Sequence, residues 1–257
     1  MSKQSKRERQ RMNREARKEY EAQLARRRKM WKTVRNFSII LVPIIVIGVV
    51  LSVTSSDDDS PKASGKCADV ETPAAKTVTL PAPEVSLDPN QQYRATLETT
   101  CGTIEFDLAS QQYPISANNF VYLTNEKFFD DLAFVRASKN HVVQAGSPTQ
   151  SQTGGPGYSL QAEVPTTQPP YPTGTVAWAK GPTEAAGTIA SQFFIVTGDG
   201  SSLPTPDYAV IGTVSKGLDV AKKIAKLAPA SGDGPPTRPV VITKASIRTL
   251  GVVPPTT

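Results

Sequence analysis

The sequence predicts a mainly β domain behind a long N-terminal extension. Between residues 92 and 250 the chain holds many short runs of alternating apolar and polar residues, and only two segments that read as helices. Glycine and proline separate these runs, as they do where turns join antiparallel strands. Before residue 92 the composition is basic, then apolar, then rich in proline and serine. These observations indicate a β-barrel or sandwich with helical plugs, preceded by segments outside its core.

The first 36 residues are predicted to be a basic, cytoplasmic helical arm. Residues 1–35 hold 14 Lys and Arg against 4 Glu, a net charge of +10, whereas the rest of the chain is net −4. Residues 4–30 favour a helix but lack an apolar stripe, so we expect it to be solvated. Its simplest role is a topology signal, with contact to anionic lipid headgroups or RNA as alternatives. Because the charge is not spread over a folded domain, as it is in a compact nucleic-acid-binding domain, our prediction is no nucleic-acid partner, with RNA contact by the arm kept only as the alternative.

An uncharged run from Phe37 to Val53 follows the arm. As a helix it would measure about 25 Å, near the short end of what crosses a bilayer. We therefore predict a transmembrane anchor at 37–54, with a buried core helix or a cleaved signal peptide as alternatives. At the flanks of this run the charge is asymmetric, since Arg35 and the basic arm precede it and Asp57, Asp58 and Asp59 follow it. The positive-inside rule then predicts a single-pass protein of the cell membrane with an extracytoplasmic body.

Residues 55–91 are rich in proline, serine and alanine, which predicts a semi-extended spacer that cannot form a core. Cys67 in this spacer and Cys101 in the body are the two cysteines of the chain. Outside the membrane a disulfide between them would persist, and we favour it over two unpaired thiols. With two cysteines and His141 as the one histidine, a four-cysteine zinc site and His-rich metal sites are excluded. A zinc ligand or general base at His141 is disfavoured because no second histidine or cysteine pair assists it, and a Ser-His-Asp hydrolase would require this residue as its base.

The body, residues 92–257, reads as strands with two helices. Strands are expected at 93–99, 103–108, 133–136, 142–144, 174–179, 193–197, 210–214 and 240–247. Helices are expected at 116–125, with Ser116 as the N-cap, and at 218–227. A turn at Cys101-Gly102 joins the first two strands.

Three segments of the body carry a resemblance to a known family. The first contains Phe134-Val135-Arg136 and His141-Val142-Val143-Gln144-Ala145-Gly146, the second is Gly154-Gly155-Pro156-Gly157-Tyr158, and the third contains Gly174-Thr175-Val176-Ala177-Trp178-Ala179-Lys180 and Ser191-Gln192-Phe193-Phe194-Ile195. Phe-x-Arg, Gln-x-Gly and Ser-Gln-Phe-Phe-Ile in this order are a specific combination. Over about 92–250 the chain resembles cyclophilin-type peptidyl-prolyl isomerases. The order of anchor, linker and body is similar to membrane-anchored cyclophilins of Gram-positive bacteria.

The resemblance implies an eight-stranded antiparallel β-barrel capped by two helices, with its site in a groove on the outer face. It implies Arg136 as the catalytic arginine and Gln144 as the residue that orients it. The substrate-binding residues would be Phe134, His141, Val142, Trp178, Lys180, Gln192, Phe194, Leu203 and Tyr208. For Trp178, packing in the core is the simplest alternative.

The implied reaction is the cis–trans isomerisation of X–Pro bonds in extracytoplasmic polypeptides, which needs no metal or cofactor because no bond is broken. Several family residues differ here: Val135 replaces a histidine, His141 a phenylalanine and Lys180 an asparagine. The resemblance therefore leaves open a degenerate cyclophilin that binds proline segments without turning them over. A further alternative is an assembly factor whose working part is the basic arm.

Overall fold

The computed structural model describes residues 66–88, 90–166, 171–203 and 206–252. The predicted basic arm at 1–36 and the predicted anchor at 37–54 lie outside these described residues. Among the residues that are described, no helix is both long and apolar enough to span a membrane.

The described part of the chain is mainly β and contains two helices, as the sequence predicts. Its strands are β1 (Gln91–Thr99), β2 (Gly102–Leu108), β3 (Leu132–Ala133), β4 (Arg136–Ser138), β5 (Val142–Ala145), β6 (Leu160–Gln161), β7 (Thr175–Trp178), β8 (Thr188–Ile189), β9 (Phe193–Val196), β10 (Val210–Lys216), β11 (Asp233–Gly234) and β12 (Val241–Val252). Its helices are α2 (Pro114–Asn125) and α3 (Leu218–Ala225).

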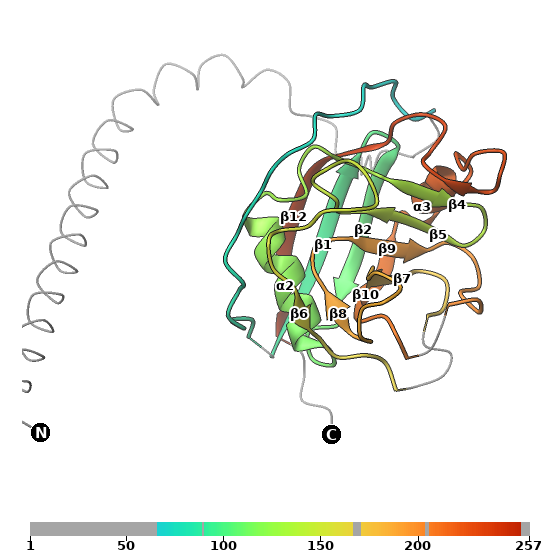
Figure 1. Ribbon diagram of the computed structural model, residues 1–257. Coiled ribbons are helices and arrows are strands. Elements are labelled where there is room, and N and C mark those ends of the chain that lie inside the picture. The colour runs from blue at the N-terminus through green and yellow to red at the C-terminus, as the bar shows by residue number, and fades with distance from the viewer. Residues whose placement is uncertain (1–65, 89, 167–170, 204–205, 253–257) are drawn as a thin grey trace, which may run out of the picture. The chain divides into compact units, whose positions relative to one another are not determined.

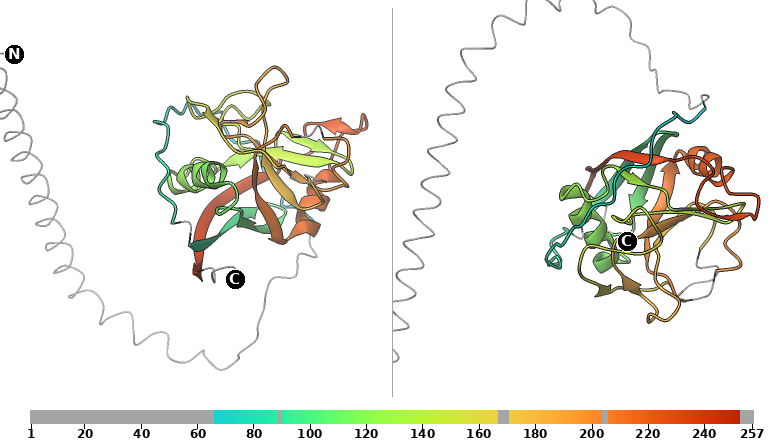
Figure 2. Two further views of the ribbon diagram at one scale, coloured as in Figure 1. Left: turned by 90° about the horizontal axis from the view of Figure 1, so that it is seen from below. Right: turned by 45° about the horizontal axis from the view of Figure 1, so that its top comes forward.

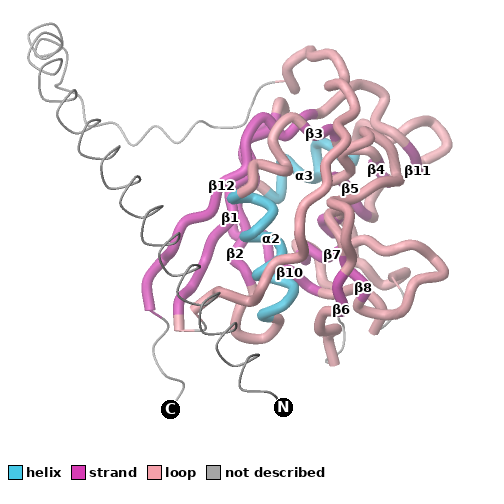
Figure 3. Tube along the Cα trace, turned by 60° about the vertical axis from the view of Figure 1, so that its left-hand side comes forward, coloured by secondary structure: helices cyan, strands magenta, loops and turns pink. Residues whose placement is uncertain are grey.

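Ten of these strands form one curled sheet in the order β11-β4-β5-β9-β7-β10-β2-β1-β12-β3 (Figures 1 and 2). β6 and β8 pair separately. The sheet has ten strands where the resemblance implied eight, and the two-residue strands β11 and β3 stand at its two ends. α2 packs against β10 and β12, and α3 packs against β2, β4 and β5 (Figure 3).

Aromatic rings fill the space between the sheet and α2. The ring of Phe120 in α2 stacks on Phe129 at a centroid distance of 4.8 Å and meets Phe106 of β2 and Phe193 of β9 edge-on. All four side chains are buried. The alternation along β1 and β2 aims one face of each strand at this core, because successive side chains of a strand point to opposite faces.

The start of α2 differs from the sequence prediction. The helix begins at Pro114, a residue suited to the first turn because its missing N–H would have no partner there. The carboxylate of Glu163, which is distant in sequence, accepts hydrogen bonds from backbone N–H groups of the first turn. Ile115 N donates to its Oε1 (3.0 Å) and Ser116 N donates to its Oε2 (3.3 Å). A carboxylate at a helix N-terminus is electrostatically favourable.

Ser116 is therefore not the N-cap but a buried residue inside the first turn. Its hydroxyl donates to the carbonyl of Val210 (2.6 Å) and accepts from Nε1 of Trp178 (2.9 Å). Ser116 thus joins α2 to β7 and β10, which satisfies the polar atom of the largest buried side chain.

The strand predicted at 133–136 is two strands with a crossing between them. Phe134 N donates to the carbonyl of Val240 (2.8 Å), whereas Val135 N donates to the carbonyl of Gln144 (2.9 Å). The chain therefore leaves β12 and joins β5 within two residues. This step ends β3 and begins β4, and it places Arg136 at the start of the new strand.

Residues 66–88 form a strap that lies along the body, beside α2 (Figure 1). Ala68 N donates to the carbonyl of Thr100 and Leu80 N to that of Pro156. Near the end of the strap, Asn118 of α2 accepts from Ser86 N and donates to the carbonyl of Glu84. Three apolar side chains of the strap pack on the core: Val78, Leu80 and Leu87. This differs from the predicted spacer, because these spaced apolar residues are partly buried against the core although they form no helix or strand.

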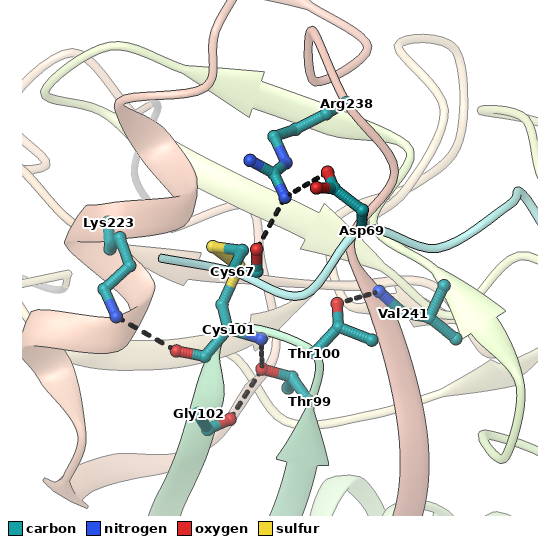
Figure 4. Close-up of a disulfide and its surroundings, with 9 residues drawn as sticks. All are labelled: Cys67, Asp69, Thr99, Thr100, Cys101, Gly102, Lys223, Arg238 and Val241. Carbon is teal, nitrogen blue, oxygen red and sulfur yellow. Dashed lines mark hydrogen bonds and ion pairs between the residues drawn. A yellow bond between two sulfur atoms is a disulfide. The ribbon is translucent and has the colours of Figure 1, made fainter. Parts of the chain in front are cut away.

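The structure joins Cys67 of the strap to Cys101 in the turn between β1 and β2, and both residues are buried (Figure 4). Arg238 donates to the carbonyl of Cys67 and to the carboxylate of Asp69 (2.6 Å). Lys223 of α3 donates to the carbonyl of Cys101 (3.1 Å). The bridge that the sequence analysis favoured is thus formed and is surrounded by charged donors.

Candidate functional site

A groove of about 830 Å³ lies on the face of the sheet that points away from the core. Side chains that alternate with core residues along β5 and β9 line this groove. Phe193 belongs to the main core, whereas its neighbours Gln192 and Phe194 line the groove. In the same way Val143 is core, and Val142 and Gln144 line the groove. The period of two in a strand thus separates the packing residues from the candidate binding residues.

Arg136 supplies the positive charge of the groove. Its guanidinium donates from Nε and from one terminal nitrogen, Nη2, to the two carboxylate oxygens of Asp233, both at 2.7 Å. This hydrogen-bonded pairing raises the pKa of Arg136 and lowers the pKa of Asp233. The Arg136 side chain keeps 29% of its surface exposed, so the charge remains accessible to a ligand.

Gln144 does not take the role that the resemblance implied for it. It stands opposite Arg136 in the β4–β5 register, but its amide donates to Oε1 of Gln192 (2.9 Å). Gln192 in turn donates to the carbonyl of Gly154 (3.1 Å). The two glutamines therefore connect β5 and β9 to the glycine loop, and Asp233 is the residue that holds Arg136. The sequence offered no motif that marked Asp233.

The apolar part of the groove is lined by Val142, Phe194, Leu203 and Tyr208. The rings of Phe194 and Tyr208 meet edge-on at a centroid distance of 5.1 Å. Such a pocket suits a small saturated ring, because it offers apolar surface and excludes water.

Tyr171 supports this apolar part from beneath, and the sequence reading missed it. It is 1% exposed. Its hydroxyl accepts from Tyr208 N (2.7 Å) and Asp207 N (3.2 Å) and donates to the carbonyl of Tyr208 (3.0 Å). One donor and two acceptors are the full capacity of a hydroxyl. Tyr171 therefore fixes the backbone that carries Tyr208.

Lys180 lines the groove, but its charge is already paired. Its side chain is only 5% exposed, and Nζ lies 3.1 Å from Oδ2 of Asp207. Nζ also donates to the carbonyls of Glu184 (2.9 Å) and Gly181 (3.3 Å). An ammonium group has three donors, so these three partners satisfy it. Lys180 therefore ties the loop at 181–184 to Asp207 and offers no free charge to a substrate.

Three residues predicted to bind substrate lie elsewhere. Phe134 is 3% exposed and Trp178 is fully buried, and both belong to the main core. Trp178 points inward because it alternates with Ala177 and Ala179, which lie on the groove side. His141 is not among the residues that line the groove, and its Nδ1 lies 3.3 Å from the Ser202 hydroxyl. Burial and the charge of Arg136 lower the pKa of His141.

The glycine-rich segment forms a further wall of the groove, with Gly154, Gly155 and Gly157 in its lining. Gly157 has φ +92°, and a Cβ there would lie 3.0 Å from the side chain of Thr79 in the strap. Gly146, at φ +93°, would place a Cβ 2.2 Å from the carbonyl oxygen of Ser191. Both positions need glycine, because the backbone conformation and the close approach each disfavour a side chain.

The groove thus combines an accessible arginine, two linked amides and an apolar pocket. Within the described ranges no group of three or more His, Cys, Asp or Glu side chains is placed to hold a metal ion. This set of residues suits binding of an extended chain and electrostatic stabilisation better than nucleophilic chemistry.

Comparison with known proteins identifies the family. Residues 94–247 match the model of the cyclophilin type peptidyl-prolyl cis-trans isomerases. A probable peptidyl-prolyl cis-trans isomerase B of Mycobacterium leprae is 39% identical over 187 residues, which cover 66% of this chain and 61% of that protein. Peptidyl-prolyl cis-trans isomerase B of Bacillus subtilis is 35% identical over 126 residues, which cover 48% of this chain and 82% of that protein.

The fold is also found among solved structures. A cyclophilin type isomerase of Cryptosporidium parvum superposes with a TM-score of 0.56 at 21% identity, covering 61% of this chain and 98% of that one. The chain spans about three fifths of the length of its mycobacterial relative. From the family match over most of the body, the chain belongs to the cyclophilin-type peptidyl-prolyl isomerase family.

Proposed function

We propose that this protein is a peptidyl-prolyl cis–trans isomerase that acts on X–Pro bonds of polypeptides. The observation that carries the proposal is the accessible guanidinium of Arg136 in the same groove as the apolar side chains of Val142, Phe194 and Leu203. The names of the relatives and the family support the same activity.

The reaction explains why these residues suffice. Resonance keeps the X–Pro amide planar behind a barrier of about 18–20 kcal/mol. When the bond twists, resonance is lost and the amide nitrogen regains its lone pair. The Arg136 guanidinium can donate to that lone pair, an interaction made mainly in the transition state and therefore one that accelerates. The apolar pocket holds the proline ring while the rest of the peptide rotates.

A second candidate function is a binding module that holds proline segments without turnover. One observation favours it: two of the donors of Arg136 are already engaged by Asp233. If those donors were the ones needed in the transition state, binding would survive and catalysis would not.

We also propose that the isomerase domain is held outside the cytoplasm by a single membrane anchor at 37–54, after the cytoplasmic arm at 1–36. The charge asymmetry around the apolar run supports this orientation. The bridge between Cys67 and Cys101 suits an oxidising compartment. The clients of the isomerase domain would be proline-containing extracytoplasmic proteins, and the basic arm would contact anionic lipid headgroups. For the finer architecture we propose the family's eight-stranded antiparallel barrel capped by two helices, with the curled sheet as its wall. A basic helix and one transmembrane helix would precede it.

Exchange NMR on a panel of X–Pro peptides with the full-length chain tests the activity. Uncatalysed exchange takes about tens to hundreds of seconds, so acceleration is easily seen. We expect acceleration by the wild type and its loss in Arg136→Ala. Peptide binding without acceleration would establish the binding module instead. For the location, a protease added outside intact cells should digest the body, and full protection would contradict the proposal.

A further inference from the structure

Asp233 is the residue that fixes the guanidinium of Arg136, although 97 positions separate the two in the chain. The carboxylate receives two parallel hydrogen bonds at 2.7 Å, one from Nε and one from Nη2. A guanidinium has five N–H donors, so three remain, two on Nη1 and one on Nη2. The paired arginine can therefore still donate to a substrate from its other edge.

The backbone around Asp233 is itself held in place. β11 pairs with β4, with Asp233 opposite Ser138 and Gly234 opposite Ala137. The turn before β11 is closed by Gly232 N, which donates to the carbonyl of Pro229 (2.8 Å). The carboxylate is thus presented to Arg136 from the strand next to its own, and not from a loose loop.

We infer that Asp233 is a positioning residue for Arg136: its carboxylate orients the guanidinium in the groove before substrate binds. The inference rests on the proposed isomerase activity. An unpaired arginine has large rotamer freedom, and ordering it at the moment of reaction would oppose catalysis. A donor already oriented avoids that reorganisation. Gln144 is then free to hold Gln192, as the structure shows.

The test measures kcat and KM of the full-length chain by exchange NMR, with Asp233→Ala as the variant. We expect kcat to fall about tenfold, since a misplaced catalytic group loses that much or more, while KM changes less than twofold. Asp233→Asn, which keeps one acceptor oxygen, should recover part of the loss.

Asp107→Ala is the matched control. Asp107 receives two hydrogen bonds from Arg94 on neighbouring strands β1 and β2, and neither residue lines the groove. This variant loses the same kind of ion pair and should keep the kcat of the wild type.

Two further measurements separate positioning from a structural effect. Asp233→Ala should add no loss of kcat in an Arg136→Ala background, because the two act as one unit. The NMR signal of the Arg136 Nε–H should move in Asp233→Ala and stay in place in Asp107→Ala. Equal kcat in Asp233→Ala and Asp107→Ala, or the same loss of kcat with and without Arg136, would overturn the inference. If the wild type shows no acceleration, the proposed function fails, and an unmoved Nε–H signal would then count separately against Asp233.

Discussion

The wall of the sheet (β1, β2 and β12) and the groove region (β4, β5, β9 and β11) each contain an arginine that donates two hydrogen bonds to an aspartate. In the wall, Arg94 and Asp107 are direct cross-strand partners in a hairpin of long strands. In the groove region, Arg136 and Asp233 come from strands of three and two residues. The wall is also where the disulfide and part of the strap attach.

The difference indicates that stability and activity are carried by different parts of the molecule. Long ladders and a disulfide hold the wall, so a lost surface ion pair there matters little. The short strands of the groove region position a few polar groups on the outer face. Variants of the wall should therefore change the free energy of unfolding, and variants of the groove region should change the isomerisation rate.

The sharpest test compares the two arginines. Arg136→Ala should lower kcat about 100-fold or more, as the loss of one donor to a transition state does, with little change in melting temperature. Arg94→Ala should leave kcat within about twofold of the wild type, since it only removes partly exposed ion pairs with Asp107 and Glu105 that lie outside the groove. Exchange NMR and thermal unfolding measure both, and a similar loss of kcat in the two variants would erase the distinction.

Removing the disulfide should have the opposite effect, a loss of stability with no loss of activity. Cys67→Ser with Cys101→Ser should lower the free energy of unfolding by about 2–4 kcal/mol, because the unfolded chain loses a cross-link. Isomerisation measured well below the melting temperature should be unchanged. Reduced wild-type protein provides the control and should match the variant in urea unfolding. A large fall in kcat of the folded double variant would show that the strap shapes the groove.

Tyr171→Phe should lower stability and also weaken substrate binding, because this residue is buried and supports Tyr208, which lines the groove. Removing its hydroxyl leaves Tyr208 N and Asp207 N without their acceptor, which costs about 1–3 kcal/mol of stability. KM should rise as well, since Tyr208 lines the groove. Tyr122→Phe is the matched control, because its hydroxyl makes one solvent-exposed hydrogen bond to the strap. Unchanged KM in Tyr171→Phe would mean that the pocket does not depend on this support.

The smallest effect expected is a pH dependence of stability from His141. Burial and the charge of Arg136 place its folded-state pKa below the ordinary value of 6.5. Between the two values the unfolded chain binds more protons, so stability falls as the pH drops below about 6.5 and levels off under the folded pKa. Urea unfolding at pH 7.5 and 5.5 measures this, and His141→Gln should remove the difference. Since the chain has no other histidine, a slope that persists in the variant would exclude His141 as its source.

The sequence predicted the fold class and most elements because they depend on local pattern. Alternation marked the strands near 93–99 and 103–108 within about two residues, and the helix expected at 218–227 is α3. The resemblance led to eight of the residues that line the groove, Arg136 among them.

Local sequence pattern could not predict contacts between segments that lie far apart in the chain. Glu163 caps α2 from 47 positions away, so the expected N-cap at Ser116 was wrong. Asp233 stands between two glycines in the two-residue strand β11, and Tyr171 stands between prolines. Neither position carries a periodic signal. Phe134 and Trp178 were placed in the groove because family likeness does not reveal which way a side chain points, and both proved to be core, Trp178 on the inner face of β7 and Phe134 in the crossing between β3 and β4.

The bridge between Cys67 and Cys101 also determines how the body can be detached from what precedes it. Because the sulfur link bypasses residues 68–100, one proteolytic cut anywhere among them leaves residues 1–67 covalently joined to the rest of the chain. Reduction alone does not release the body either, since the peptide chain still connects the two parts. Shedding of the body by a cut between Cys67 and Cys101 therefore requires both a protease and a reductant.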